Sequence, residues 1–230
     1  MEHLHYFPVS FALAVLFFAI LIALLVLIQI GVLRRAYSLL GIDPFVVVLA
    51  LFGSLLGSYV NIPIWRLPNE RIVTHEVVEI LGVPFLAPVA VNWPGTVLAV
   101  NVGGALIPAL LSLYLLFRHH LWLSAIVAVA IVSFVVHDMA TPIPGVGIAV
   151  PTIAPPLLAA FAGLVFSRDY AAPLAYIAGS LGVLIGADLT NLGQLQTLGA
   201  PVASIGGAGT FDGVFLTGVI AVLLASMVRR

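Results

Sequence analysis

The stretch AAPLAYIAGSLGVLIGADLTNL, residues Ala171–Leu192, contains one charged residue, Asp188. A hydrocarbon core about 30 Å thick requires roughly 20 predominantly apolar residues in a helix, so this stretch predicts a transmembrane helix. A carboxylate inside such a helix costs about 2.5–3.5 kcal/mol on insertion scales, and an intramembrane acid is therefore a candidate functional residue. Asp188 is the first side chain whose presence has to be explained.

Six further apolar stretches have about the length needed to cross a membrane. The chain is 63% hydrophobic and 7% charged, which leaves too little polar surface for a water-soluble domain of 230 residues. We predict an all-α polytopic membrane protein with about seven transmembrane helices, in which residues 1–230 form a single integral membrane domain. The predicted spans are Val9–Leu33, Pro44–Val60, Val97–Phe117, Leu121–His137, Thr152–Phe166, Ala171–Leu192 and Thr210–Val228.

Arginine placement predicts the orientation of the chain in the cell membrane. The loops after spans one, three and five and the C-terminus carry six arginines, whereas the opposite face carries Arg66 and Arg71. Cytoplasmic loops are enriched in basic residues, so we expect the N-terminus outside and the C-terminus in the cytoplasm. The six arginines are Arg34, Arg35, Arg118, Arg168, Arg229 and Arg230.

The largest polar insertion, at about residues 61–96, then lies on the outer side. Its sequence RIVTHEVVEILGVPFLAPVAVNWPG, residues 71–95, has β-branched runs interrupted by Gly82, Val83 and Pro84. This pattern predicts a β-ribbon of two strands joined by a turn. We expect the ribbon to lie at the membrane surface as a lid or rim, although a loop that only connects spans two and three fits the pattern as well.

A second acid, Asp212, lies in the last predicted span. Asp188 follows Arg168 by 20 residues and Asp212 precedes Arg229 by 17 residues. At a helical rise of 1.5 Å per residue, the two acids lie about 30 and 26 Å from the cytoplasmic boundary. The same calculation from Arg118 places the adjacent residues His137 and Asp138 at a similar distance from the cytoplasmic boundary. We therefore expect three acids in one layer near the outer face of the membrane.

Each acid also has a structural explanation. Asp212 follows a glycine-rich segment and could cap a helix that starts at Thr210 or Phe211. Asp188 lies near the end of its span, where the helix dipole disfavours a negative charge, so its alternative is a surface acid in interfacial water. A His-Asp pair such as His137 and Asp138 is also typical of a helix end at the membrane interface.

Glycine and proline mark two further segments. Gly207 and Gly209 lie among small residues that allow helix backbones to approach closely. The segment TPIPGVGIAVPTIAPP, Thr141–Pro156, has five prolines and cannot be helical throughout. At membrane depth such a backbone is tolerated only where it is buried or lines a wet cavity. The segment is therefore either a substrate-facing or pore-lining loop or an ordinary connector outside the membrane.

Five blocks of the sequence resemble the prokaryotic membrane family catalogued as domain of unknown function 1614. The resemblance covers nearly the whole chain beyond the first span and implies an integral membrane protein, for which an intramembrane protease activity has been suggested. The blocks are GSYVNIPIWRLP (Gly57–Pro68), AVNVGGALIPALLSLYLL (Ala99–Leu116), PGVGIAVPTIAPP, LIGADLTNL and SIGGAGTFDGVFLTGVIAVLLA.

A looser resemblance links the two acids to presenilin-like and signal-peptide-peptidase-like aspartyl proteases. Those enzymes use one Asp in each of two neighbouring spans, the second within a Gly-x-Gly-Asp motif. Here Gly207-Ala208-Gly209 is followed by two extra residues before Asp212, there is no Tyr-Asp at Asp188, and no Pro-Ala-Leu follows the second acid. Two adjacent carboxylates share one proton. Because Asp188 lies away from a helix N-terminus, we expect it to be the protonated partner that polarises the scissile carbonyl, and Asp212 to be the ionised base that activates water.

These observations predict an intramembrane aspartyl protease that hydrolyses membrane-embedded substrates with Asp188 and Asp212. Its partners are the lipid bilayer and transmembrane peptides, and we expect no cofactor, metal or nucleic acid, since the chain has no lysine, no cysteine and no HExxH motif. Two other classes stay open: a cation- or proton-coupled carrier and a non-catalytic scaffold. The carrier would use Asp138, Asp188 and Asp212 with Asn101 or Asn191; a metal site would need His137, Asp138 and His75 or Glu76.

Overall fold

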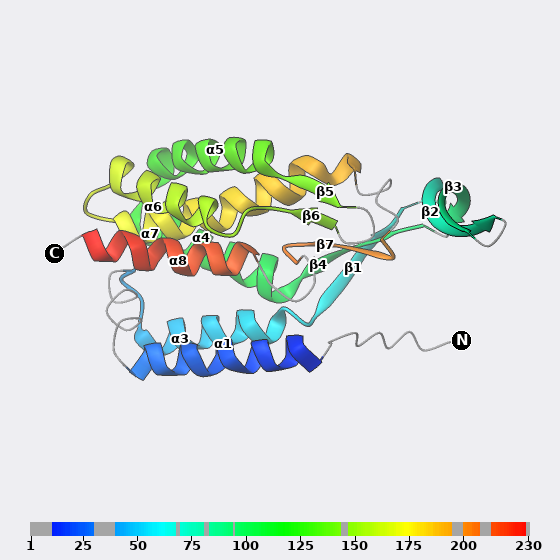
Figure 1. Cartoon of the computed structure of the whole chain (residues 1–230). Helices are drawn as coiled ribbons and strands as arrows, with labels where there is room; N and C mark the ends of the chain where they lie inside the picture. The colour runs from blue at the N-terminus through cyan, green and yellow to red at the C-terminus, as the bar shows by residue number, and fades with distance from the viewer. Residues whose placement is uncertain are drawn as a thin grey trace.

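The computed structural model describes residues 11–29, 40–67, 70–80, 83–93, 95–143, 147–194, 200–207 and 213–228. The chain is mostly helical, with a small sheet. Figure 1 shows the helices side by side with roughly aligned axes, and the strands gathered beyond one end of them. Among the described residues, three helical stretches are long and apolar enough to cross a membrane: Val102–His119, Trp122–Met139 and Ala171–Gln194.

The helices follow the apolar stretches of the sequence. Within the described ranges, each of the seven predicted spans contains a helix. Three of these spans overlap the long apolar helical stretches named above, and the helices in the remaining four spans are 13–19 residues long. In chain order the helices are α1 (Phe11–Gln29), α3 (Pro44–Gly57), α4 (Ile107–His119), α5 (Trp122–Met139), α6 (Ala154–Phe166), α7 (Ala171–Val183) and α8 (Gly213–Val228).

Helix α7 forms the centre of the bundle. Twelve of its thirteen residues are buried, and it packs against α4, α5, α6 and α8. Glycine makes the approach to α5 possible, because a Cβ atom on Gly182 would lie 2.5 Å from Val132 Cγ1 and one on Gly186 would overlap the backbone of Ser133. Small residues at helix crossings are the usual means of close packing in membranes.

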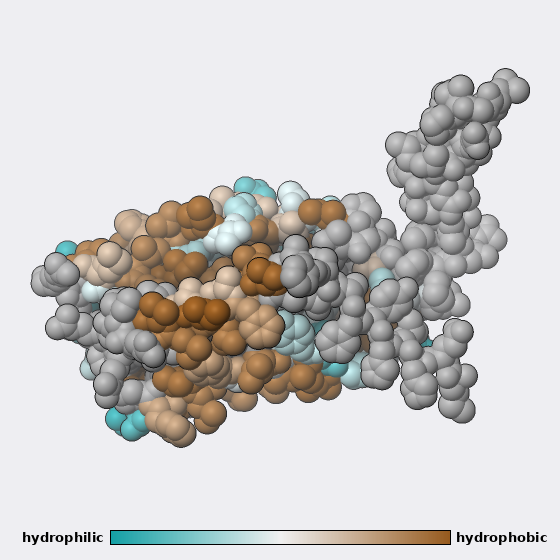
Figure 2. Space-filling view, turned by 60° about the horizontal axis from the view of Figure 1, so that its bottom comes forward, coloured by the Kyte–Doolittle hydropathy of each residue, from teal (hydrophilic) through white to brown (hydrophobic). Residues whose placement is uncertain are grey.

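The outer surface of the bundle is apolar. Large side chains that are more than half exposed include Leu123, Phe134 and Phe161, at 77%, 76% and 64%. Figure 2 shows hydrophobic residues along the length of the helices, with smaller groups of hydrophilic residues between them and near the ends. This surface suits contact with lipid better than contact with water.

A three-stranded sheet lies at one end of the bundle. It consists of β1 (Asn61–Arg66), β4 (Val97–Asn101) and β7 (Val202–Ile205) in the order β1-β4-β7, with β4 antiparallel to β1 and parallel to β7. The prediction that the third span begins at Val97 is therefore wrong. The first five residues form β4, a π-helical turn η1 (Val102–Leu106) follows, and only then does α4 begin.

Two hairpins complete the strand layer. β2 (Glu70–Ile80) pairs antiparallel with β3 (Val83–Trp93), which confirms the predicted ribbon at the level of the backbone. β5 (Thr141–Ile143) pairs with β6 (Gly147–Ala149), and α6 starts only at Ala154, so the proline-rich segment Thr141–Pro156 is not helical throughout, as predicted. The sheet and the second hairpin add strands that the all-α prediction did not contain.

Candidate functional site

Asp188 lies just after the central helix α7, where the backbone is no longer α-helical. After α7 the chain forms a π-helical turn η2 (Leu184–Asp188) and then a 3-10 helix η3 (Leu189–Gln194). Single π-helical turns inside helices often occur at functional sites, because the extra residue displaces side chains from the regular helical faces. The half-buried Asp188 is the last residue of this turn.

The carboxylate of Asp188 is held by the sheet. The backbone N–H of Gly206, the residue after β7, donates a hydrogen bond of 2.7 Å to Asp188 Oδ2. Gly206 has φ +78°, and a Cβ atom at this position would lie 2.5 Å from the backbone nitrogen of Ala105. Only glycine combines this left-handed conformation with such a close approach.

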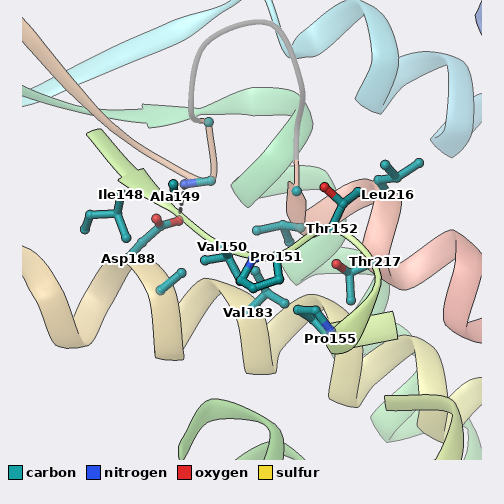
Figure 3. A pocket seen from close by; sticks show the side chains of 15 residues that line it. Ile148, Ala149, Val150, Pro151, Thr152, Pro155, Val183, Asp188, Leu216 and Thr217 are labelled. Carbon is teal, nitrogen blue, oxygen red and sulfur yellow. Dashed lines mark hydrogen bonds between the residues drawn. The ribbon is translucent and has the colours of Figure 1, made fainter. Parts of the chain in front are cut away.

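A cavity of about 460 Å³ opens beside Asp188. Its walls come from the segment Ile148–Thr152, Pro155 of α6, the end of α7 with η2, the two glycines after β7, and the start of α8. Figure 3 shows Asp188 reaching from its helix toward the backbone after β7, with Val150, Pro151 and Val183 nearby. The volume is within the range of binding sites for small ligands.

The lining of this cavity is mainly apolar. Among the described residues that form it, Asp188 is the one ionisable side chain, and Thr152 and Thr217 supply hydroxyl groups. An isolated acid in an apolar, partly water-accessible cavity is a typical candidate for acid–base chemistry.

The predicted second acid lies in an undescribed segment. Asp212 and Gly209 are outside the described residues, as are Arg34, Arg35, Arg229 and Arg230. Gly207, which precedes this segment, and Gly213, which directly follows Asp212 in sequence, both line the cavity.

His137 and Asp138 are exposed near the end of α5, and neither lines the cavity. His137 Nδ1 lies 2.8 Å from Thr190 Oγ1, whose hydroxyl donates to the Gly186 carbonyl at 2.7 Å. This chain of bonds joins α5 to the helical segment that carries Asp188.

The two asparagines considered as carrier ligands have structural partners. The buried Asn101 donates to the Ser58 carbonyl at 2.7 Å and accepts from the Gly104 N–H at 2.8 Å. Asn191 Nδ2 donates to the carbonyls of Gly186 and Ala187 at 3.2 and 2.9 Å. Both amides thus satisfy backbone groups at the irregular turns η1 and η2, which gives them a structural role.

The sequence prediction missed β7 and Gly206. The sequence pattern that indicates β7 is only four residues long. Val-Ala-Ser-Ile at residues 202–205 is a strand-like run bounded by the turn-forming residues Pro201 and Gly206. It also missed the polar link across the sheet, in which Ser204 Oγ donates to Asn61 Oδ1 and Asn101 Nδ2 donates to the same atom at 3.0 Å.

No group of three His, Asp or Glu side chains able to hold a metal ion is present in the part of the chain that the structure describes. His75 and Glu76 lie on β2, where only the backbone is described.

The sequence profile of one protein family matches residues 55–224, and the family is described as "Protein of unknown function (DUF1614)". No curated protein and no solved structure matches the chain.

Proposed function

Because the chain belongs to the DUF1614 family, whose description assigns no activity, we propose its function from the site itself: an intramembrane aspartyl protease with Asp188 and Asp212 as its catalytic pair. The proposal rests chiefly on one observation. Asp188 is the single ionisable side chain among the described residues that line an apolar cavity, and this cavity is also lined by Gly207 and Gly213, on either side of the segment that contains Asp212.

The proposed reaction needs two carboxyl groups in different protonation states. Two carboxyl groups a few ångströms apart do not both ionise, so one stays protonated and the other is a base. The base removes a proton from water as the water attacks the scissile carbonyl carbon, and the protonated partner donates a hydrogen bond to the carbonyl oxygen. The peptide nitrogen then takes a proton as the bond breaks, and two shorter chains leave the site.

The cavity supports a peptide substrate over a cation. A dehydrated cation requires several oxygen ligands, and the described lining offers one carboxylate and two threonine hydroxyls among mainly apolar groups. The amides of Asn101 and Asn191, which a carrier would use as ligands, are bonded to the backbone. Apolar walls instead suit the side chains of a membrane-embedded peptide.

The membrane arrangement is part of the proposal. We place seven helices across the bilayer, with the N-terminus outside, the C-terminus in the cytoplasm and the strand layer at the outer face. Asp188 lies at the boundary between helices and strands, in the last third of the candidate span Ala171–Gln194. At this depth water can reach the carboxyl group while the substrate segment still lies within the membrane.

The test is cleavage by the purified full-length protein in liposomes. A transmembrane peptide with a fluorophore and quencher on either side of its outer third reports hydrolysis. We expect Asp188→Asn and Asp212→Asn each to lower the cleavage rate at least about a hundredfold, since acid–base groups contribute about 10²- to 10⁴-fold. Asp138→Asn is the matched control, because Asp138 is exposed at a helix end and does not line the cavity.

Asn retains an oxygen that can accept from Gly206, so Asp188→Asn is expected to fold. Undiminished cleavage in either Asp188→Asn or Asp212→Asn would refute the catalytic pair, as would an equal loss in Asp138→Asn.

A further inference from the structure

Strand β7 presents one side of its backbone to β4 and the other away from it. The N–H of Val97 donates to the carbonyl of Pro201 at 3.0 Å, and Val97 and Ala99 are paired with Val202 and Ser204 in the parallel register. In a parallel ladder a residue bonds to the residues on either side of its register partner. The backbone groups of residues 201, 203 and 205 therefore face β4, and those of Val202 and Ser204 face outward.

The outward side of β7 is an edge of the sheet. β7 is the last strand in the order β1-β4-β7, and no described residue bonds to the Val202 N–H, the Val202 carbonyl or the Ser204 N–H. The Ser204 carbonyl accepts from the N–H of Gly207 at 3.2 Å. Unpaired groups along a strand edge are a template for another extended chain.

The carboxylate of Asp188 lies in line with the outward-facing backbone groups of β7. By the same alternation, the N–H of Gly206 points outward like those of Val202 and Ser204, and its acceptor is Asp188 Oδ2. The carboxylate thus occupies the place where a neighbouring strand would put a carbonyl oxygen. From residue 202 to residue 206 the row extends about 13 Å at the usual rise of about 3.3 Å per residue.

We infer that the outward edge of β7 binds the substrate as an added β-strand, an extended apolar segment of polypeptide whose backbone pairs with Val202 and Ser204 and whose scissile bond reaches Asp188. A polypeptide is the occupant because the outward backbone groups of β7 alternate donor and acceptor at the spacing of a peptide backbone. A lipid chain has no such alternating donors and acceptors with which to pair. The adjoining cavity, with Val150, Val183 and Leu216 on its walls, receives an apolar side chain beside the cleaved bond.

Cleavage at Asp188 rests on the proposed function, whereas strand addition at β7 does not. The chain has no cysteine, so single cysteines can be introduced without background. The protein carries Val202→Cys together with Asp188→Asn, which prevents turnover. The probe is a leucine- and valine-rich transmembrane peptide in liposomes, whose single cysteine is moved one residue at a time, and disulfide formation is measured after mild oxidation.

Strand pairing predicts cross-linking at every second peptide position, at least about fivefold above the positions between, because only alternate side chains share a face with residue 202. Ile62→Cys is the matched control. Ile62 lies on β1 at the opposite edge of the same sheet and is 45% exposed, against 48% for Val202. We expect no periodic cross-linking there.

A second variant tests the backbone group directly. Val202→Pro removes the outward N–H without removing a bond to β4, and proline is tolerated at the first residue of an edge strand. We expect the affinity for the peptide, measured by fluorescence anisotropy, to fall about three- to tenfold more than in Val202→Ala, which shortens the same side chain but keeps the N–H.

The outcomes separate the inference from the protease proposal. Alternate cross-linking without cleavage by the wild-type protein supports the strand site and refutes the protease. Cleavage by the wild type with cross-linking that is uniform, or that repeats every three to four residues, supports the protease and overturns the strand site. Disulfides between two copies of Val202→Cys in place of the peptide also overturn it, because a second chain would then cover the edge.

Discussion

The backbone N–H of Gly206 donates a hydrogen bond of 2.7 Å to Asp188 Oδ2 and so joins the end of the strand layer to the end of the central helix. Gly206 follows β7, and Asp188 ends the π-helical turn after α7. One oxygen of the carboxylate is fixed by this bond, and no described residue donates to Oδ1. The bond orients the acid.

The first prediction concerns the contribution of this bond to stability. Asp188→Ala leaves the Gly206 N–H without its acceptor in a partly buried site, which should lower the free energy of unfolding by about 1–3 kcal/mol. Asp188→Asn should change it by less than about 1 kcal/mol, since the amide oxygen can accept the same bond. Both are measured by denaturant unfolding in detergent micelles; equal stability of the two variants would contradict the structural importance of the bond.

The second prediction concerns Gly206 itself. Gly206→Ala should destabilise the protein by about 1–3 kcal/mol or more, because alanine is strained at φ +78° and its Cβ would overlap the backbone at Ala105. Gly193→Ala is the control: nothing lies within 4 Å of a Cβ at Gly193, and its stability should change by less than about 0.5 kcal/mol. The melting temperatures of the two variants are compared by thermal unfolding in the same detergent. Similar melting temperatures would contradict the requirement for glycine at position 206.

The helices could be predicted from the sequence because long apolar stretches have one stable arrangement in lipid. The β2-β3 ribbon was also predictable, since Gly82 and Pro84 interrupt two β-branched runs. Strand β4 was not. Its sequence Val-Leu-Ala-Val-Asn is followed by the apolar helical residues of η1 and α4. A short apolar run fits the pattern of a helix and that of a strand equally well. What decides its conformation is pairing with β1 on one side and β7 on the other.

The same limit applies to the site. Asp188 could be found from its charge within an apolar stretch, whereas Gly206 looks like any loop glycine until its neighbours are known. Its importance comes from Ala105 and Asp188, which are distant in sequence. Asp138 was predicted to share the level of Asp188 from helix rise alone, but rise gives height and not direction, and Asp138 is exposed and does not line the cavity.

The third prediction concerns Asn101, which is 2% exposed and bonds to three segments: Ser58 at the end of α3, Asn61 of β1 and Gly104 of η1. Asn101→Leu would leave the Gly104 N–H and the Ser58 carbonyl without their partner, and we expect a loss of at least about 2 kcal/mol. Asn61→Ala is a milder change at an exposed residue of the same network and should cost less than about 1 kcal/mol. The order of the two unfolding free energies is the test; a reversed order contradicts the central role of Asn101.

The fourth prediction tests the proposed orientation. Thr141→Cys and Ser167→Cys place single cysteines at the two ends of the segment that contains α6. If the strand layer faces outward, a membrane-impermeant maleimide should label the Thr141 variant in intact cells and the Ser167 variant only after permeabilisation. Labelling of the permeabilised sample shows that both thiols can react. Labelling of Ser167→Cys alone in intact cells would mean the opposite orientation.

The fifth prediction asks whether the cavity receives a substrate side chain. Ala149→Trp adds a large ring to the cavity wall on β6, so kcat/KM for a peptide with leucine or phenylalanine at the cleaved bond should fall at least about tenfold. A peptide with alanine at that position should be affected less, because it needs less of the volume. The control is Ile143→Trp on β5, in the same hairpin, where the side chain is 41% exposed and does not line the cavity. If both tryptophan variants reduce cleavage of both peptides equally, the cavity does not select the substrate, and the loss reflects a disturbed hairpin.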